Sequence, residues 1–159
     1  MKSIQNGSNT YHYDPNRFKP SYEVINKLEA LRLLEDCRET LHKNGVKMIL
    51  CMGTLLGAIR DQDFIDWDYD IDVAFLEKSK IQVIDCIPDL KEKGINVCRY
   101  DGKLLSFERN GTYIDFYFFV KHYFFWYKNT TGITTKKKYF DDTQEYNFLG
   151  SDFLVPFDY

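Results

Sequence analysis

Residues 46–76 read VKMILCMGTLLGAIRDQDFIDWDYDIDVAFL and determine the architecture that we expect for the chain. The apolar run at residues 46–52 predicts a short buried strand, and residues 55–60 predict a helical turn or short helix directly after it. A polar loop then leads to a second predicted strand at residues 69–76. These elements predict two strands joined through a helix and an acidic loop.

The second strand alternates acidic and apolar side chains. Asp70 and Asp72 share one face. The opposite face carries Ile71, Val73 and Phe75. Two neighbouring carboxylates repel each other, and a divalent cation removes that conflict. Mg²⁺ is typically held by one or two carboxylates together with substrate phosphates. The spacing therefore favours a metal-binding pair, with an exposed acidic strand as the alternative.

A third carboxylate lies in a later apolar run. Asp115 is the only acidic residue between Tyr113 and Val120, a segment that we expect to be a strand. A lone Asp in such a strand costs free energy unless it is paired or binds a metal. We expect Asp115 to face Asp70 and Asp72 from a neighbouring strand and to complete a one- or two-metal site. A hydrogen-bonded or edge-strand Asp is the alternative.

The Gly53-Thr54 turn complements these carboxylates. A strand that ends in Gly-Thr and continues into a helix presents backbone N–H groups to phosphate. Taken alone, the pair is equally consistent with a simple strand-to-helix turn. With 15 residues between Thr54 and Asp70, the combination indicates phosphoryl transfer, a reaction in which metal ions and positioning do most of the work.

Two further helices are expected. The first covers residues 21–44, with Ser21 as its N-cap and Asn44-Gly45 as its stop. The second covers residues 78–93 and should be interrupted at Pro88. The apolar face of the first helix is expected to consist of Val24, Leu28, Leu31, Leu34 and Leu41.

The second half of the chain predicts strands. Three strand-like runs follow Gly94, and Asp101-Gly102 and Asn110-Gly111 are typical of the tight turns between them. Residues 122–128 are dense in aromatic side chains and fit either a strand or an irregular segment, whereas the last twenty residues predict no element. The order of elements predicts an α/β or α+β fold, a mixed sheet flanked by helices.

The composition fits one globular domain. The chain has 159 residues, with 21 Lys and Arg against 24 Asp and Glu, and a formal net charge of −3. This mild acidity argues against general nucleic-acid binding, which usually needs a basic surface. The one basic run, at residues 136–138, is expected to be a solvated loop. No apolar run approaches the ~18 residues of a membrane-spanning helix, so we expect no transmembrane segment.

Cysteine usage bears on the compartment. The four cysteines form no CxxC pair. Buried free thiols are therefore expected, as is typical of a reducing compartment, and they favour a cytoplasmic location. A secretory lumen, reached by an export signal that has been removed, is the alternative. It has some support from the Asn-x-Ser/Thr sequons at Asn6, Asn110 and Asn129.

A family resemblance rests on the same segment. Residues 53–60 read GTLLGAIR, Phe64-Ile65 follows, and residues 67–72 read WDYDID. This succession resembles the signature of the LicD family, which includes the fukutin-related proteins: GTLLGxxR, a Phe-Ile-Pro step, and Trp-Asp-Asp-Asp-Ile-Asp. Residues 113–116 resemble the later strand that contributes a third carboxylate, and the likeness covers roughly residues 21–156.

The resemblance implies a nucleotidyltransferase-like fold related to polymerase-β-type catalytic domains. It also implies an enzyme that moves a phosphate-linked group, of the phosphocholine or ribitol phosphate type, from a CDP-activated donor to a glycan acceptor with Mg²⁺ or Mn²⁺. Arg60 is expected to neutralise phosphate or to form a structural salt bridge. The implied site consists of metal-binding catalytic residues Asp70, Asp72 and Asp115, and substrate-phosphate-binding residues Gly53, Thr54 and Arg60.

Some features depart from the family pattern. Asp66 stands where the family usually has Pro, and Tyr69 replaces the middle Asp of the acidic run. Val155-Pro156 resembles a later landmark of the family, past which its members usually continue, whereas this sequence ends three residues later. We therefore expect an extended N-terminal arm at residues 1–20 and one catalytic domain at residues 21–159 that is shortened at its C-terminus. Recognition of the donor base or of the acceptor would then be absent, be supplied by a partner chain or a second copy, or lie in a part of the protein outside this sequence.

Two alternative functions stay open. The same metal site would serve nucleotidyl transfer onto protein, RNA or a small molecule. A shortened family member would also fit a non-catalytic module that binds a nucleotide or a partner chain. The identity of the donor's head group and of the acceptor does not follow from the residues.

Overall fold

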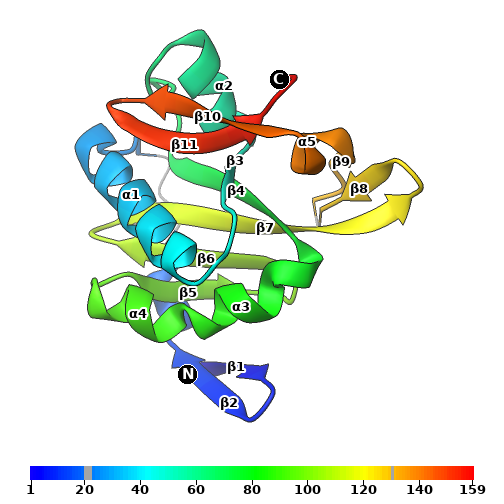
Figure 1. Cartoon of the computed structure of the whole chain (residues 1–159). Coiled ribbons are helices and arrows are strands. Elements are labelled where there is room, and N and C mark those ends of the chain that lie inside the picture. The colour runs from blue at the N-terminus through cyan, green and yellow to red at the C-terminus, as the bar shows by residue number, and fades with distance from the viewer. Residues whose placement is uncertain (20–22, 130) are drawn as a thin grey trace.

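The structure is a computed structural model and describes residues 1–19, 23–129 and 131–159. These residues form a mixed α+β fold around one main sheet (Figure 1). The strand order is β10-β11-β3-β4-β7-β6-β5, with β8 paired to β7 and β9 paired to β8. Strands β4 and β7 are parallel neighbours near the middle of this order.

The strands are β1 (Lys2–Asn6), β2 (Asn9–Tyr13), β3 (Ile49–Leu50), β4 (Asp70–Leu76), β5 (Asn96–Tyr100), β6 (Leu104–Arg109), β7 (Thr112–Tyr123), β8 (Trp126–Lys128), β9 (Thr134–Lys136), β10 (Thr143–Phe148) and β11 (Ser151–Pro156). The helices are α1 (Lys27–Lys43), α2 (Met52–Arg60), α3 (Lys80–Asp85), α4 (Ile87–Glu92) and α5 (Lys138–Asp141). Two 3₁₀ turns cover Pro15–Arg17 and Glu77–Ser79.

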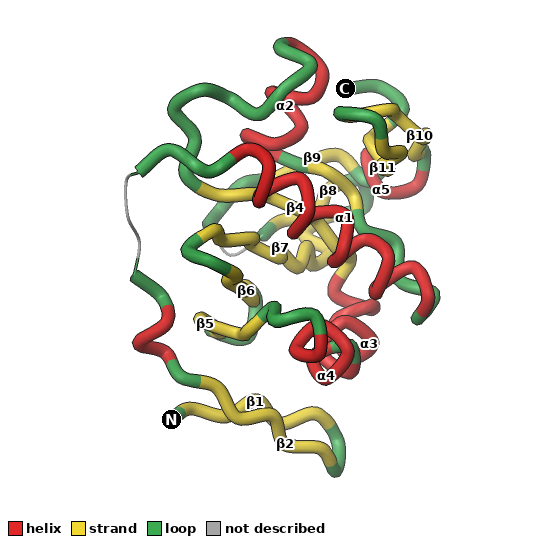
Figure 2. The backbone as a smooth tube through the Cα atoms, turned by 90° about the vertical axis from the view of Figure 1, so that its left-hand side faces the viewer, coloured by secondary structure: helices red, strands yellow, loops and turns green. Residues whose placement is uncertain are grey.

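The two faces of the sheet differ. Helices α1, α3 and α4 lie together on one side (Figure 2), where they bury the main hydrophobic core. On that side β4 contributes Ile71, Val73 and Phe75, as the alternation predicts. The opposite face carries Asp70 and Asp72 and a smaller apolar cluster around Phe119 and Phe140. The acidic face is thus the one that these three helices leave uncovered.

Helix α1 is shorter than predicted. It begins after Asn26, whose side chain accepts a hydrogen bond from the Glu29 N–H at 3.1 Å and acts as the N-cap. The predicted cap, Ser21, lies outside the described residues. The predicted apolar face was partly wrong, because Val24 and Leu28 are exposed. The buried face consists of Ala30, Leu33, Leu34, Cys37 and Leu41.

Several local predictions are confirmed. Pro88 lies in the first turn of α4, and the helix expected there is divided into α3 and α4. Asn110 and Gly111 both have positive φ, as a tight hairpin turn between β6 and β7 requires. The strand predicted at residues 46–52 is reduced to Ile49–Leu50, since the chain turns at Met52 (φ 47°) to begin α2.

Both ends of the chain are more ordered than expected. The N-terminal segment forms the hairpin β1–β2 instead of an extended arm, with Ile4 buried in the core. The last residues form the hairpin β10–β11, and β11 pairs in parallel with β3 at Leu154 and Ile49. Strand β10 has the polar sequence TQEYNF, which is typical of an edge strand. Such a sequence has no run of apolar residues from which a strand could be predicted.

All four cysteines are free, and three of them are buried, as expected. In the part of the chain that the structure describes, we find no helix that is both long and apolar enough to cross a bilayer.

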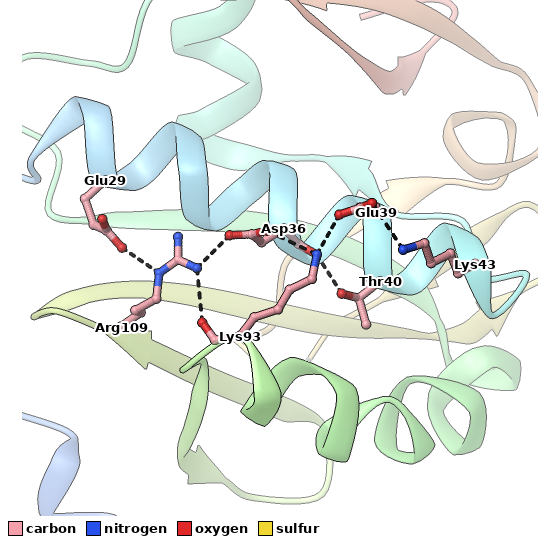
Figure 3. Close-up of polar contacts among 7 residues, drawn as sticks. All are labelled: Glu29, Asp36, Glu39, Thr40, Lys43, Lys93 and Arg109. Carbon is pink, nitrogen blue, oxygen red and sulfur yellow. Dashed lines mark hydrogen bonds and ion pairs between the residues drawn. The ribbon is translucent and has the colours of Figure 1, made fainter.

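An ion-pair network joins α1 to the sheet and to α4 (Figure 3). Arg109 of β6 donates to Glu29 and Asp36 of α1, at 2.6 Å each. The Lys93 ammonium, just after α4, bonds Asp36 at 3.1 Å and Glu39 at 2.6 Å. Burial alone would raise the pKa of Asp36, but the hydrogen bonds from Arg109 and Lys93 outweigh it and hold the pKa below its usual value.

We expect Arg109→Met to lower the free energy of unfolding by about 2 kcal/mol, because it leaves two carboxylates without their half-buried partner. Lys43→Met is the matched control: its pair with Glu39 is exposed on both sides and should matter by less than about 0.5 kcal/mol. Urea unfolding at neutral pH measures both. Equal, small effects would show that the network around Arg109 does not hold α1 in place.

Candidate active site

The parallel register of β4 and β7 brings the predicted carboxylates together. Asp72 and Asp115 are direct neighbours across the two strands, and Asp70 is the neighbour of Tyr113. Asp72 is 7% exposed and Asp115 is 3% exposed, so both lie in a buried setting. The structure therefore places all three predicted acidic residues on one small area of the sheet.

Asp115 is paired with an arginine that the sequence did not single out. Arg99 of β5 donates to Asp115 Oδ2 at 2.6 Å and to the Ser106 hydroxyl of β6 at 2.9 Å. The register makes Arg99, Ser106, Asp115 and Asp72 consecutive neighbours across four strands. The guanidinium carbon of Arg99 also lies 4.3 Å from the ring centre of Phe18. The site is thus a row of polar residues that crosses the sheet.

The N-terminal segment borders this row. The Tyr113 hydroxyl lies 3.1 Å from the carbonyl oxygen of Arg17 and accepts from the Lys19 N–H at 3.0 Å. The ring of Phe18 meets that of Tyr113 edge to face, with 5.5 Å between centroids. Residues 17–19 therefore cover the edge of the site beside Asp70.

The turn before α2 is attached to Asp72. The Gly53 N–H donates to Asp72 Oδ2 at 3.2 Å, and the Asp72 N–H donates to the Thr54 hydroxyl at 2.8 Å. A side chain at position 53 would not fit, because its Cβ would lie 2.5 Å from Asp68 Oδ2. Gly53 therefore lets the backbone approach the carboxylates closely, at a turn where Met52 holds a positive φ of 47°.

Thr54 and Arg60 both contact other groups of the protein, and for Arg60 this is the structural salt bridge that the sequence left open as the alternative. Thr54 is 2% exposed, and its hydroxyl holds the backbone of Asp72 in place. Arg60 forms a two-point ion pair with Asp61 at 2.7 and 2.6 Å and lies 6.0 Å from the Trp67 ring. Of the three predicted phosphate-binding residues, Gly53 is therefore the one that contacts the carboxylate cluster directly.

Asp68 is a fourth carboxylate at the site. Sequence reasoning assigned it to a solvated loop, but it lies against Gly53 and close enough to Asp70 to raise its pKa. Its place in the WDYDID run was the available signal, since it precedes Asp70 by two residues. Arg99 had no comparable signal, because its position depends on the pairing of β5, β6 and β7.

Asp70 and Asp72 have pKa values far above the ordinary range of an aspartate. Burial, then the charges of Asp115 and Asp68, raise the pKa of Asp70 to about 7. Burial, then the charges of Asp70, Asp115 and Asp68, raise the pKa of Asp72 to about 8, against a hydrogen bond from Gly53 that lowers it. These shifts identify a cluster of negative charge that lacks sufficient positive charge.

The donor set fits a divalent cation. Oxygen ligands from carboxylates suit Mg²⁺ and Mn²⁺, and Asp115 Oδ1 is buried with no hydrogen-bond partner. In the described residues, however, no group of three acidic, histidine or cysteine side chains is arranged to hold a metal ion as it stands. Arg99 already neutralises Asp115, so an incoming cation would compete with this guanidinium.

An apolar cavity of about 430 Å³ lies beside the carboxylates. It is lined by Ala74 of β4 and Phe119 of β7, which lie two and four residues beyond Asp72 and Asp115 on the same strands. Cys51 and Met52, next to the Gly53 turn, line it as well. The cavity and the acidic row therefore share one face of the sheet.

Comparison with known families decides the assignment. The LicD/FKTN/FKRP nucleotidyltransferase domain matches residues 45–158. The chain belongs to the LicD family. The match begins just before β3 and runs through β11, so it includes the Gly53 turn, Asp70, Asp72 and Asp115.

Curated relatives add little about function. Two uncharacterized proteins, RT0683 of Rickettsia typhi and RP689 of Rickettsia prowazekii, are each 34% identical to this LicD-family chain over 78 residues. The match covers 48% of the chain but only 25% and 29% of those proteins. The matched segment thus spans 25% and 29% of the length of these two relatives.

Solved structures confirm the predicted fold class. The antibiotic-resistance factor ANT(2'')-Ia has a TM-score of 0.60 at 12% identity, covering 82% of this chain and 66% of that one. The lincosamide adenylyltransferase LnuA has a TM-score of 0.53 at 14% identity, covering 84% and 82%. A candidate nucleotidyltransferase from Thermotoga maritima has a TM-score of 0.54 at 13% identity, covering 86% and 83%. The LicD-family chain has the nucleotidyltransferase fold.

The raised pKa values predict how stability depends on pH. The folded chain keeps protons on Asp70 and Asp72 that the unfolded chain, with a pKa near 3.8, releases. In metal-free buffer, stability should therefore fall as pH rises from about 4 to about 8. Asp70→Asn should raise the free energy of unfolding at pH 8 by at least about 1 kcal/mol and flatten this dependence. Urea titrations with EDTA at several pH values measure both; a flat wild-type profile would contradict the crowding of these carboxylates.

Asp115→Asn should act in the opposite direction. It removes the charge that Arg99 pairs with and should lower metal-free stability by about 1–2 kcal/mol. Urea unfolding of Asp115→Asn and Asp70→Asn under the same metal-free conditions should show a loss of stability in the first variant and a gain in the second. A stabilising Asp115→Asn would mean that the ion pair with Arg99 does not support the fold.

Proposed function

We propose that this LicD-family domain is a metal-dependent phosphotransferase, which moves a phosphate-linked group from a CDP-activated donor to a glycan acceptor. Family membership and fold support a transferase of the nucleotidyltransferase fold. The observation that carries the proposal is the side-by-side position of Asp72 and Asp115, with the Gly53 turn bonded to Asp72. The CDP donor, with a phosphocholine or ribitol phosphate head group, follows from the resemblance to the family.

Each residue of the site has a part in this proposal. Asp70, Asp72 and Asp115 would hold Mg²⁺ or Mn²⁺, which supplies positive charge to the donor phosphates and aligns them. The turn at Gly53 and the first N–H groups of α2 would receive the pyrophosphate, because a helix N-terminus favours anions. Thr54 positions Asp72 through its backbone, and Arg99 holds Asp115 in place.

The bonds that change are defined by the donor. An acceptor hydroxyl would attack the phosphorus nearest the transferred group, and the bond from that phosphorus to the bridging oxygen would break. CMP would leave with the electron pair, and the hydroxyl proton would pass to solvent or to a carboxylate of the site. The reaction needs no covalent enzyme intermediate.

Nucleotidyl transfer is the second candidate. The fold is shared with ANT(2'')-Ia, which has been solved in complex with adenylyl-2''-tobramycin. The same carboxylates would then direct the attack to the other phosphorus, so that the nucleoside monophosphate remains on the acceptor. A non-catalytic nucleotide- or partner-binding module is the remaining candidate, and binding without turnover would identify it.

The test uses CDP-choline labelled in both the choline and the cytidine, with Mn²⁺ and lipid-linked or free glycans as acceptors. We expect choline label on the acceptor and a loss of about a hundredfold or more in Asp72→Asn, because the metal-holding charge is removed. Asp66→Asn is the matched control, since Asp66 lies in the same acidic segment but is exposed and pairs with Lys27. Its activity should be unchanged.

Four results would contradict the proposal. Cytidine label on the acceptor would indicate nucleotidyl transfer. Undiminished activity in Asp72→Asn would exclude the carboxylate site. Nucleotide binding without turnover would indicate a non-catalytic nucleotide-binding module, and calorimetry without binding of Mn²⁺ or cytidine nucleotide would favour a module that binds a partner chain.

A further inference from the structure

The strand β7 extends beyond the sheet and carries an exposed aromatic tip. Its last residues pair with β8, and β8 pairs with β9, so that these short strands form a projection at one side of the molecule (Figure 1). We call the described residues 121–129 and 131–136 the aromatic finger. Its tip consists of Tyr123, Phe124, Phe125 and Trp126, which are 67%, 84%, 74% and 40% exposed.

Four consecutive exposed aromatic side chains are costly in water. Such a cluster in a soluble domain marks a surface that is covered during function. The tip is the end of a hairpin, with Phe124 and Phe125 in the two-residue turn between β7 and β8. The end of one hairpin offers little area for a protein interface of ordinary size.

The charge around the tip is strongly segregated. Residues 116–140 contain five lysines and no Asp or Glu, whereas the whole chain has a charge of −3, so the remainder carries −8. Lys136 is the strand neighbour of Trp126, and Lys121 lies 5.9 Å from the Phe124 ring. Within the described residues, Lys121, Lys128 and Lys136 form no ion pair with an acidic side chain. Lys137 and Lys138 pair with Asp141 and Asp158, so three of the five lysines have no ion-pair partner among the described residues.

We propose that the aromatic finger binds the surface of an anionic lipid bilayer. Tyr and Trp favour the headgroup region, where an apolar ring and a polar group are both accommodated. Phe124 and Phe125 would enter the acyl boundary, and the lysines behind them would meet the anionic headgroups. The negative remainder of the chain is repelled by the same surface and would face away from it.

The apolar cavity adds an independent observation. Ile133 and Thr135 of the finger line its wall together with Phe119, Tyr139 and Phe140. The finger therefore carries the aromatic tip and part of the cavity wall, and Phe119 places the cavity between Asp115 and Tyr123 along β7. The inference does not rest on the transfer activity, because membrane binding needs no substrate.

The experiment measures binding of the whole chain to vesicles. The chain has two tryptophans, so Trp67→Phe makes Trp126 the sole reporter at the tip. Vesicles of phosphatidylcholine with phosphatidylglycerol should shift the Trp126 emission to shorter wavelength, and brominated lipids should quench it. The chain should bind pure phosphatidylcholine vesicles at least about tenfold more weakly. Added salt should weaken its binding to the anionic vesicles.

Two sets of variants locate the contact. Phe124→Ser with Phe125→Ser should weaken binding at least about tenfold through lost apolar burial, and Lys121→Glu with Lys136→Glu should remove the preference for anionic lipid. Ile81→Ser is the matched control, an exposed apolar residue of α3 away from the finger, and should bind normally. Circular dichroism confirms that each variant is folded.

Three outcomes would overturn the proposal. The first is no binding to anionic vesicles at low salt. The second is equal binding by the folded tip variant and the wild type. The third is self-association that the tip variant abolishes without any vesicle binding, which would assign the tip to a second copy of the chain.

Discussion

The parallel register of β4 and β7 is the constraint on which the site depends. It makes Asp72 and Asp115 neighbours although they lie far apart along the chain. The other face of the same strands places Ile71, Val73, Ile114 and Phe116 in the main core. A slip of either strand by one residue would bury its carboxylate among those apolar side chains and expose the apolar ones. The hydrophobic core therefore enforces the position of the acidic groups, and the fold cannot form without assembling the site.

Assembling the site is unfavourable by itself. Buried carboxylates that face one another disfavour their charged forms, as the raised pKa values of Asp70 and Asp72 record. Arg99 offsets part of this cost at Asp115, and the Gly53 N–H offsets part of it at Asp72. Neither contact neutralises Asp70. The row of polar residues therefore remains short of positive charge after all its internal contacts, and the proposed metal ion would supply it. The network around Arg109 differs, because each of its carboxylates meets a cation.

The parts of the fold that the sequence predicts are those with a short-range cause. Alternation with period two placed Asp70, Asp72 and Asp115 on the acidic face, and the Asn110-Gly111 turn and the break at Pro88 follow from local backbone preferences. What the sequence could not predict depends on pairing between distant segments. Arg99 reaches Asp115 because β5, β6 and β7 share a register, and Thr54 is buried because α2 begins against β4. The strands β10 and β11 were not predicted, because an edge hairpin with a Leu149-Gly150 turn lacks both a strong apolar alternation and a typical turn sequence.

The strand β7 connects the acidic site to the aromatic finger. Its first part is buried and carries Asp115, and its last part is exposed and carries Tyr123. Tyr123 is eight positions after Asp115, which corresponds to roughly 26 Å along a strand. With β7 upright on a bilayer, the carboxylates would stand several Debye lengths above the anionic surface, where its field no longer opposes the binding of a negatively charged donor. The length of β7 would therefore keep the acidic site clear of the surface that the aromatic finger is proposed to bind.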